Sequence, residues 1–137
     1  LINFMSTILL AEDDYSLRDR YAASLREEGF EVVLAETADE ILRNFRCSKP
    51  DILIADTCLG EGTYGSDACE ELLRTGELEN TLVMGISSSS ISENNWRGLA
   101  YAFHNKRFLD EKRFGKIVRT TYETYLAKRI ELVHMGS

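Results

Sequence analysis

The stretch Ile8-Leu-Leu-Ala-Glu-Asp-Asp14 indicates the class of fold. Four consecutive apolar residues end abruptly at three acidic residues. A short apolar run of this kind predicts a strand that is buried on both faces, as the strands of parallel sheets are. The stretch Pro50-Asp-Ile-Leu-Ile-Ala-Asp56 repeats the pattern and also ends in an acid. Both stretches therefore predict strands of a buried parallel sheet.

Strands and helices alternate along the rest of the chain. Further strands are expected at about 31–35, 82–86 and 103–105. Apolar residues at helical spacing predict helices over about 16–28, 37–46, 66–76 and 92–103, and a long one after residue 110. The helix at 92–103 is the weakest of these, because it contains Gly98 and two asparagines. Five strands alternating with five helices predict an α/β fold with helices on both faces of a parallel sheet.

Capping residues mark where several helices should begin. Thr37 and Glu40 form a capping box, and Asp110 precedes the last helix. Ser66 or Asp67 is expected to cap the third helix.

Length and composition limit the possible classes of protein. The 137 residues suit one domain, expected at 7–130, with 1–6 and 134–137 as tails or added residues. A net charge of -7 without a basic stripe argues against nucleic-acid binding, and no apolar run is long enough for a membrane span. The three cysteines lack metal-type pairing, which favours a reducing cytoplasm.

Polar residues stand where the predicted strands end. Glu12 and Asp13 follow the first strand, Asp56 ends the third, Ser87 ends the fourth and Lys106 follows the fifth. The carboxyl ends of parallel strands meet at one edge, where ligands bind. Clustered carboxylates favour a hard divalent cation such as Mg²⁺. These residue types suit metal-assisted phosphoryl transfer, with Asp56 as the nucleophile and Lys106 and Ser87 contacting phosphate oxygens.

Over roughly residues 7–126, these motifs in this order resemble the receiver domain of response regulators in two-component signalling. The resemblance implies a flavodoxin-like (βα)5 fold, a doubly wound parallel sheet with strand order 2-1-3-4-5. It also implies that Asp56 is the phosphoacceptor. In this family pattern Asp13 and Asp56 bind Mg²⁺ directly, Glu12 acts through water, and the Cys58 carbonyl is a further ligand.

The resemblance also implies how the domain would work. Ser87 would be the switch hydroxyl, and Phe103, three residues before Lys106, the switch aromatic. A histidine kinase or histidine phosphotransfer protein would supply the phosphoryl group. The domain would catalyse its own phosphorylation and dephosphorylation while acting mainly as a signalling switch. Phosphorylation would reposition the face made of the fourth helix, the fifth strand and the fifth helix, and a homodimer could form through this face.

Two positions depart from the family pattern. Arg107 replaces the proline that usually follows the lysine, and a cis bond to a non-proline residue costs roughly 2.5–4 kcal/mol. We therefore expect a trans Lys106–Arg107 bond and a different path for the chain beyond it. Gly60 replaces another proline and begins a glycine-rich loop, which we expect to become ordered when metal or phosphate binds.

Other interpretations remain open. The departures at Gly60 and Arg107 are compatible with a receiver-like protein-binding module that works without phosphorylation. A flavodoxin-like flavin binder is disfavoured because the acids at 12–14 would repel its phosphate. Taken singly, Asp56 could be a turn aspartate that ends a strand, and Lys106 could be a surface lysine. An arrangement without function would require all of these separate explanations to hold at once.

Overall fold

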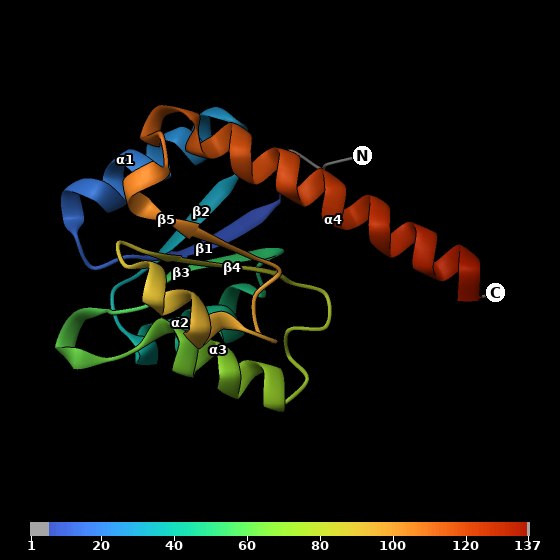
Figure 1. The fold of residues 1–137 in the computed structure, drawn as a ribbon, viewed down its shortest axis with the longest axis horizontal. Coiled ribbons are helices and arrows are strands. Elements are labelled where there is room, and N and C mark those ends of the chain that lie inside the picture. The colour runs from blue at the N-terminus through green and yellow to red at the C-terminus, as the bar shows by residue number, and fades with distance from the viewer. Residues whose placement is uncertain (1–5, 137) are drawn as a thin grey trace.

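The computed structural model describes residues 6–136 and shows a sheet between two layers of helices (Figure 1). All strand pairs are parallel, and the order is β2-β1-β3-β4-β5. This confirms the predicted topology. The strands are β1 (Thr7–Ala11), β2 (Glu31–Ala35), β3 (Ile52–Asp56), β4 (Leu82–Ser87) and β5 (Ala102–Asn105).

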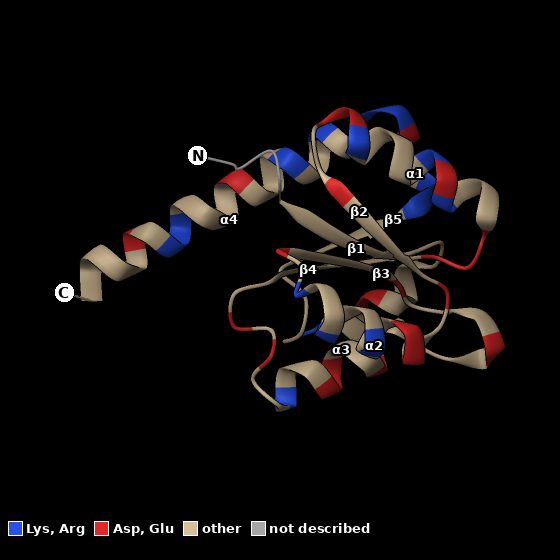
Figure 2. Cartoon of the chain, turned by 180° about the vertical axis from the view of Figure 1, so that it is seen from behind, with Lys and Arg blue, Asp and Glu red and all other residues tan. Residues whose placement is uncertain are grey.

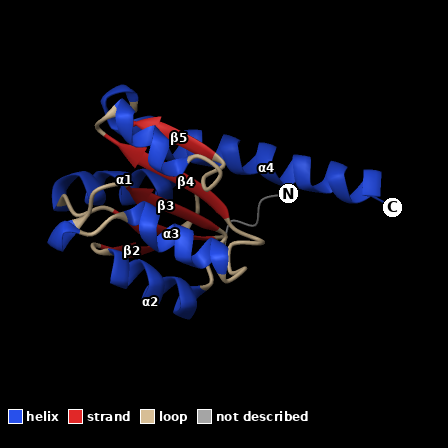
Figure 3. Cartoon of the chain, turned by 60° about the horizontal axis from the view of Figure 1, so that its bottom comes forward, coloured by secondary structure: helices blue, strands red, loops and turns tan. Residues whose placement is uncertain are grey.

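The core has two halves because successive strand residues point to opposite faces of the sheet. Ile8 and Ile54 pack under α1 (Tyr15–Glu27) and α4 (Phe114–Gly136). Leu9 and Leu53 face the other way, towards α2 (Ala38–Ser48) and α3 (Gly65–Arg74). Figure 3 shows the two helix layers on either side of the sheet. The apolar runs of the sequence are therefore buried on both faces, as predicted.

Helix starts agree with the predicted caps at two of three positions. Thr37 accepts a 3.2 Å hydrogen bond from the Glu40 backbone, and Asp110 caps the short 3-10 helix η4 (Glu111–Arg113) that leads into α4. The prediction that Ser66 or Asp67 caps α3 is wrong. That helix begins at Gly65, after Tyr64, whose side chain makes no capping bond.

The predicted helix over 92–103 is also wrong. The chain forms a 3-10 segment, η2 (Ser90–Trp96), then a turn in which Gly98 has a φ of 70°. The described residues therefore contain four α-helices, not five. Weak helix propensity is one cause, and the other is that Trp96 turns into the core, where it is 2% exposed.

The structure describes nearly all of the C-terminal end but not the first five residues of the chain. Residues 1–5 and 137 of the predicted tails lie outside the described residues. Ser6 is buried and its carbonyl accepts a 3.0 Å hydrogen bond from Glu31, while 134–136 lie in α4. The end of α4 extends past the sheet (Figure 1).

Charge is distributed over the surface without a basic stripe along α1 or α4. Both helices carry acidic as well as basic residues (Figure 2). None of the helices within 6–136 has the length and apolar character that a membrane span requires.

Candidate functional site

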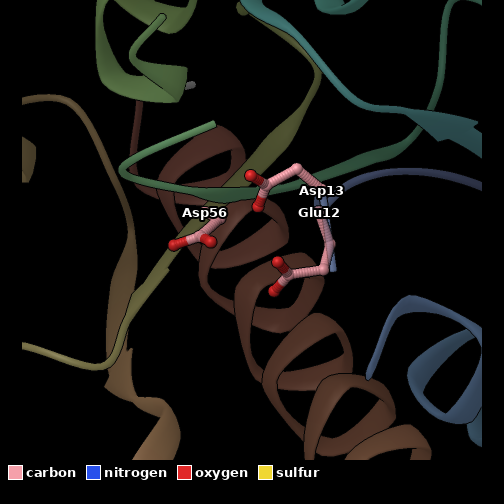
Figure 4. A group of neighbouring side chains, drawn as sticks. All are labelled: Glu12, Asp13 and Asp56. Atoms are coloured by element: carbon pink, nitrogen blue, oxygen red, sulfur yellow. The ribbon is translucent and has the colours of Figure 1, made fainter. Parts of the chain in front are cut away.

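Three carboxylates meet at the carboxyl edge of the sheet. Glu12 and Asp13 follow β1, and Asp56 ends β3. Ala11 pairs with Ala55, so the next residue of each strand comes to the same level of the sheet. One oxygen from each of the three carboxylates lies within 4.8 Å of the other two, and the side chains converge (Figure 4).

Lys106 joins this cluster from the other side of β4. Its Nζ donates hydrogen bonds of 2.9 Å to Glu12 Oε1 and 2.9 Å to Asp56 Oδ2. Glu12 is fully buried and Asp56 is 6% exposed, while Asp13 is exposed to solvent. The lysine therefore pairs with the two buried acids, and Asp13 forms the solvent side of the site.

The pKa values of the buried acids reflect burial first and the repulsion of neighbouring carboxylates second. Burial, followed by repulsion from Asp56, raises the pKa of Glu12 to about 7. Burial also raises the pKa of Asp56, although Lys106 opposes the rise. Burial alone would lower the pKa of Lys106, but its hydrogen bonds to Glu12 and Asp56 outweigh burial and raise it. One ammonium thus balances three carboxylates incompletely.

The oxygen-only donor set and its unbalanced charge fit a hard divalent cation. Such a cation would relieve the repulsion among the three acids, and Mg²⁺ in particular keeps several waters. Exposed Asp13 leaves the cluster open to solvent. Cys58, the predicted carbonyl ligand, is exposed two residues beyond Asp56, and its backbone pairs with Tyr64.

The two predicted switch residues occupy different environments. Ser87 ends β4, is 5% exposed, and its Oγ accepts a 3.1 Å hydrogen bond from the Ser89 backbone. Its neighbour Ile86 pairs with Asp56, which places Ser87 at the edge that carries the acids. Phe103 lies inside β5, half-buried against the α2–α3 side of the core. It stands away from this edge, within the sheet.

A trans peptide bond and a capped turn follow β5. No cis peptide bond occurs among residues 6–136, so the predicted trans bond between Lys106 and Arg107 is confirmed. A 3-10 helix, η3 (Lys106–Phe108), follows, and the Asn105 side chain accepts a 2.9 Å hydrogen bond from the Arg107 backbone. Lys106 therefore reaches the acids from the first turn of a capped segment.

Thr57 and Trp96 adjoin the site, and the contact between them was not anticipated from the sequence. Trp96 Nε1 donates a 2.8 Å hydrogen bond to Thr57 Oγ1, directly after Asp56. One signal was present: Gly85 interrupts an apolar strand, and a glycine in a strand often marks a close approach. A Cβ atom at Gly85 would lie 2.4 Å from the Trp96 ring.

The fold and the site together define a class of protein: doubly wound α/β domains that carry acids and a lysine at the strand ends. The family model described as "Response regulator receiver domain" matches residues 8–105, and the chain belongs to this family. Receiver domains of response regulators receive phosphoryl groups from histidine kinases.

Individual relatives agree with this membership. The sensory transduction protein RegX3 of Mycolicibacterium smegmatis is 38% identical over 68 residues, which are 50% of this chain and 29% of that protein. The chain thus matches less than a third of that relative's length.

Solved structures share the fold at low identity. The chemotaxis response regulator CheY4 of Vibrio cholerae has a TM-score of 0.75 at 18% identity, over 85% of this chain and 98% of that one. The response regulator TrrA of Thermotoga maritima, solved in complex with Mg²⁺-BeF, has a TM-score of 0.73 at 22% identity. The match covers 85% of this chain and 99% of that one.

Proposed function

We propose that the chain is a phosphorylation-controlled switch in which Asp56 accepts a phosphoryl group from a phosphohistidine of a histidine kinase or phosphotransfer protein. The observation that carries the proposal is the Lys106 ammonium, 2.9 Å from both Glu12 and Asp56, beside solvent-exposed Asp13. These groups have the charges and positions that phosphoryl transfer to a carboxylate needs.

Asp13 and Asp56 would hold Mg²⁺ or another divalent cation directly, with Glu12 acting through water and the Cys58 carbonyl as a further ligand. When bound, the cation would neutralise the carboxylates and stabilise negative charge on the phosphoryl oxygens. An Asp56 oxygen forms the new bond to phosphorus. The bond from phosphorus to the histidine nitrogen breaks, and its electron pair stays on the imidazole.

Lys106 and Ser87 would stabilise the transferred group. The Lys106 ammonium pairs with Glu12 and Asp56 before phosphorylation. After it, the ammonium would donate to a phosphoryl oxygen. The Ser87 oxygen accepts from the Ser89 backbone, so its hydroxyl proton is available to donate to a second oxygen. Both residues act on the product as well as on the transition state.

Exposed apolar residues that follow three strands of the site support a protein as the donor. Tyr15, Ile91 and Phe108 are 63%, 79% and 84% exposed. They follow β1, β4 and β5, the strands whose carboxyl ends carry the site. Apolar side chains around a polar centre favour contact with a protein surface. We propose that the donor's phosphohistidine enters between them.

Within residues 6–136, η2 stands in place of the expected fourth helix, so the face proposed for output is built differently from the expected one. We propose that η2, β5 and α4 form the corresponding face and carry the contacts of a homodimer. Tyr101 belongs to this face: it is 42% exposed, and its ring meets Tyr125 of α4 edge-on at 5.4 Å.

Acetyl phosphate with Mg²⁺ tests the proposed function. Intact-protein mass spectrometry should show one acid-stable, base-labile phosphoryl adduct on the wild type and none on Asp56→Asn. Asp39→Asn, at an exposed acid on α2, serves as the control and should be modified like the wild type. An unmodified wild type would instead favour the protein-binding module that works without phosphorylation.

A further inference from the structure

Trp96 anchors the segment that replaces the expected fourth helix. Between residues 88 and 100, a stretch the structure describes throughout, Trp96 is the only buried residue. Its indole lies over Gly85 in the middle of β4, where a Cβ atom would come within 2.4 Å of the ring. The absence of a side chain at Gly85 therefore creates the space that the indole occupies.

The indole is connected to the end of β3 by hydrogen bonds. Trp96 Nε1 donates to Thr57 Oγ1 at 2.8 Å, and Thr57 Oγ1 donates to the Ile86 carbonyl at 3.1 Å. The Thr57 backbone also donates to that carbonyl, at 2.9 Å. Thr57 is 1% exposed, so water does not compete for these bonds. A buried relay thus leads from the segment to the residue after Asp56.

The relay contacts β3 and β4, the strands that end in Asp56 and Ser87. Ile86 pairs with Asp56 and immediately precedes Ser87. At its other end the segment is attached to the same place, because the Ser89 backbone donates to Ser87 Oγ. A change at Asp56 or Ser87 would therefore act on the segment from both ends.

Besides Trp96, few contacts hold the segment: the Asn105 side chain donates a 2.9 Å hydrogen bond to Ser90 Oγ, and Leu99 and Ala100 pack partly against the core. Ile91 is 79% exposed, and Glu93, Asn94 and Asn95 are exposed as well. An exposed 3-10 segment with few buried contacts is the kind of element that changes arrangement at small cost. Trp96 supplies the one fully buried side chain between residues 88 and 100 and is therefore the main apolar anchor of this stretch.

We propose that Thr57 and Trp96 are a positioning pair that couples the state of Asp56 to the arrangement of residues 88–100. The inference rests on the proposed function, because it needs a phosphoryl group at Asp56. When that group draws Ser87 and the end of β3 towards it, the bond between Thr57 and the indole changes. Coupling is reciprocal, so weakening this bond also changes the affinity of the Asp56 site for a phosphoryl group.

The chain contains one tryptophan, so its fluorescence reports on Trp96 alone. The experiment titrates the full chain with beryllofluoride, a phosphoryl mimic, in Mg²⁺, following emission and calorimetric heat in parallel. In the wild type we expect heat of binding and a change of tryptophan emission that saturate together. Thr57→Val keeps the shape but removes the hydroxyl, so it should bind the mimic with most of the emission change lost. Thr57→Ser restores the hydroxyl and should restore the change.

If Thr57→Val does not fold, a calorimetric titration of a second variant tests the coupling. Trp96→Phe keeps an aromatic ring over Gly85 without the N–H donor, and its Kd for the mimic should differ from the wild-type value about fivefold or more. Wild-type binding without an emission change would overturn the inference, as would a full change in Thr57→Val or an unchanged Kd in Trp96→Phe. Absence of wild-type heat would instead overturn phosphorylation at Asp56, and the coupling with it.

Discussion

Lys106 donates a 2.9 Å hydrogen bond to Asp56, from which it is 50 positions distant in the sequence. The two residues belong to β3 and to the segment after β5, and β4 lies between these strands. The contact exists because parallel strands bring their carboxyl ends to one edge, where a long lysine stem can cross the intervening strand. The same ammonium also pairs with buried Glu12, so it balances two acids at once.

Replacing Lys106 by methionine should slow phosphorylation of Asp56 by acetyl phosphate about a hundredfold. The substitution keeps an unbranched apolar stem and removes the charge that stabilises the phosphoryl oxygens. Initial rates of adduct formation by mass spectrometry measure the effect. Lys116→Met changes an exposed lysine of α4 and should leave the rate unchanged. A Lys106→Met rate within a factor of three of the wild type would contradict the proposed role.

Stability without divalent ions should fall as the pH rises from about 4.5 to 7. The pKa of Glu12 is raised from 4.5 to about 7, so in this window the folded state holds a proton that the unfolded state has lost. Unfolding then releases a proton and becomes more favourable at higher pH, by about 3 kcal/mol at most for a shift of this size. Urea denaturation in EDTA measures the slope.

Glu12→Gln isolates this contribution. The amide keeps an oxygen that can accept from Lys106 but does not ionise. We expect the variant to have a flatter pH profile and to exceed the wild type in stability at pH 8. A slope equal to that of the wild type would show that another group causes the pH dependence.

Mg²⁺ should raise the unfolding temperature of the wild type and not of Asp13→Asn. A ligand at a hundred times its Kd stabilises a folded protein by about 2.7 kcal/mol. Asp14→Asn is the matched control, since Asp14 adjoins the cluster but caps α1 through a 3.1 Å hydrogen bond that asparagine can also accept. Thermal scans with Mg²⁺ and with EDTA compare the three proteins. Equal shifts for both variants would place the cation elsewhere.

The strands and the site were predictable for the same reason. The apolar runs before Glu12 and Asp56 are long enough for buried strands and too short for helices, and parallel topology then brings their ends together. Trp96 was placed on a helix because local apolar spacing was the only information there. Its actual position depends on Gly85 and Thr57, which lie on or beside other strands, and these tertiary contacts outweigh a weak local preference.

Gly65 sets the start of α3 by contact rather than by capping, and Gly65→Ala should destabilise the domain by about 1–3 kcal/mol. A Cβ atom there would lie 2.2 Å from the carbonyl oxygen of Asp56, so the helix would have to move away from the end of β3. Because that carbonyl belongs to the phosphoacceptor, the variant should also be phosphorylated more slowly. Gly60→Ala is the control, since its nearest neighbour, the Glu36 carbonyl, would be 3.4 Å away. Urea denaturation and acetyl phosphate rates measured on both variants test this, and equal stability of the two would mean that α3 can shift at no cost.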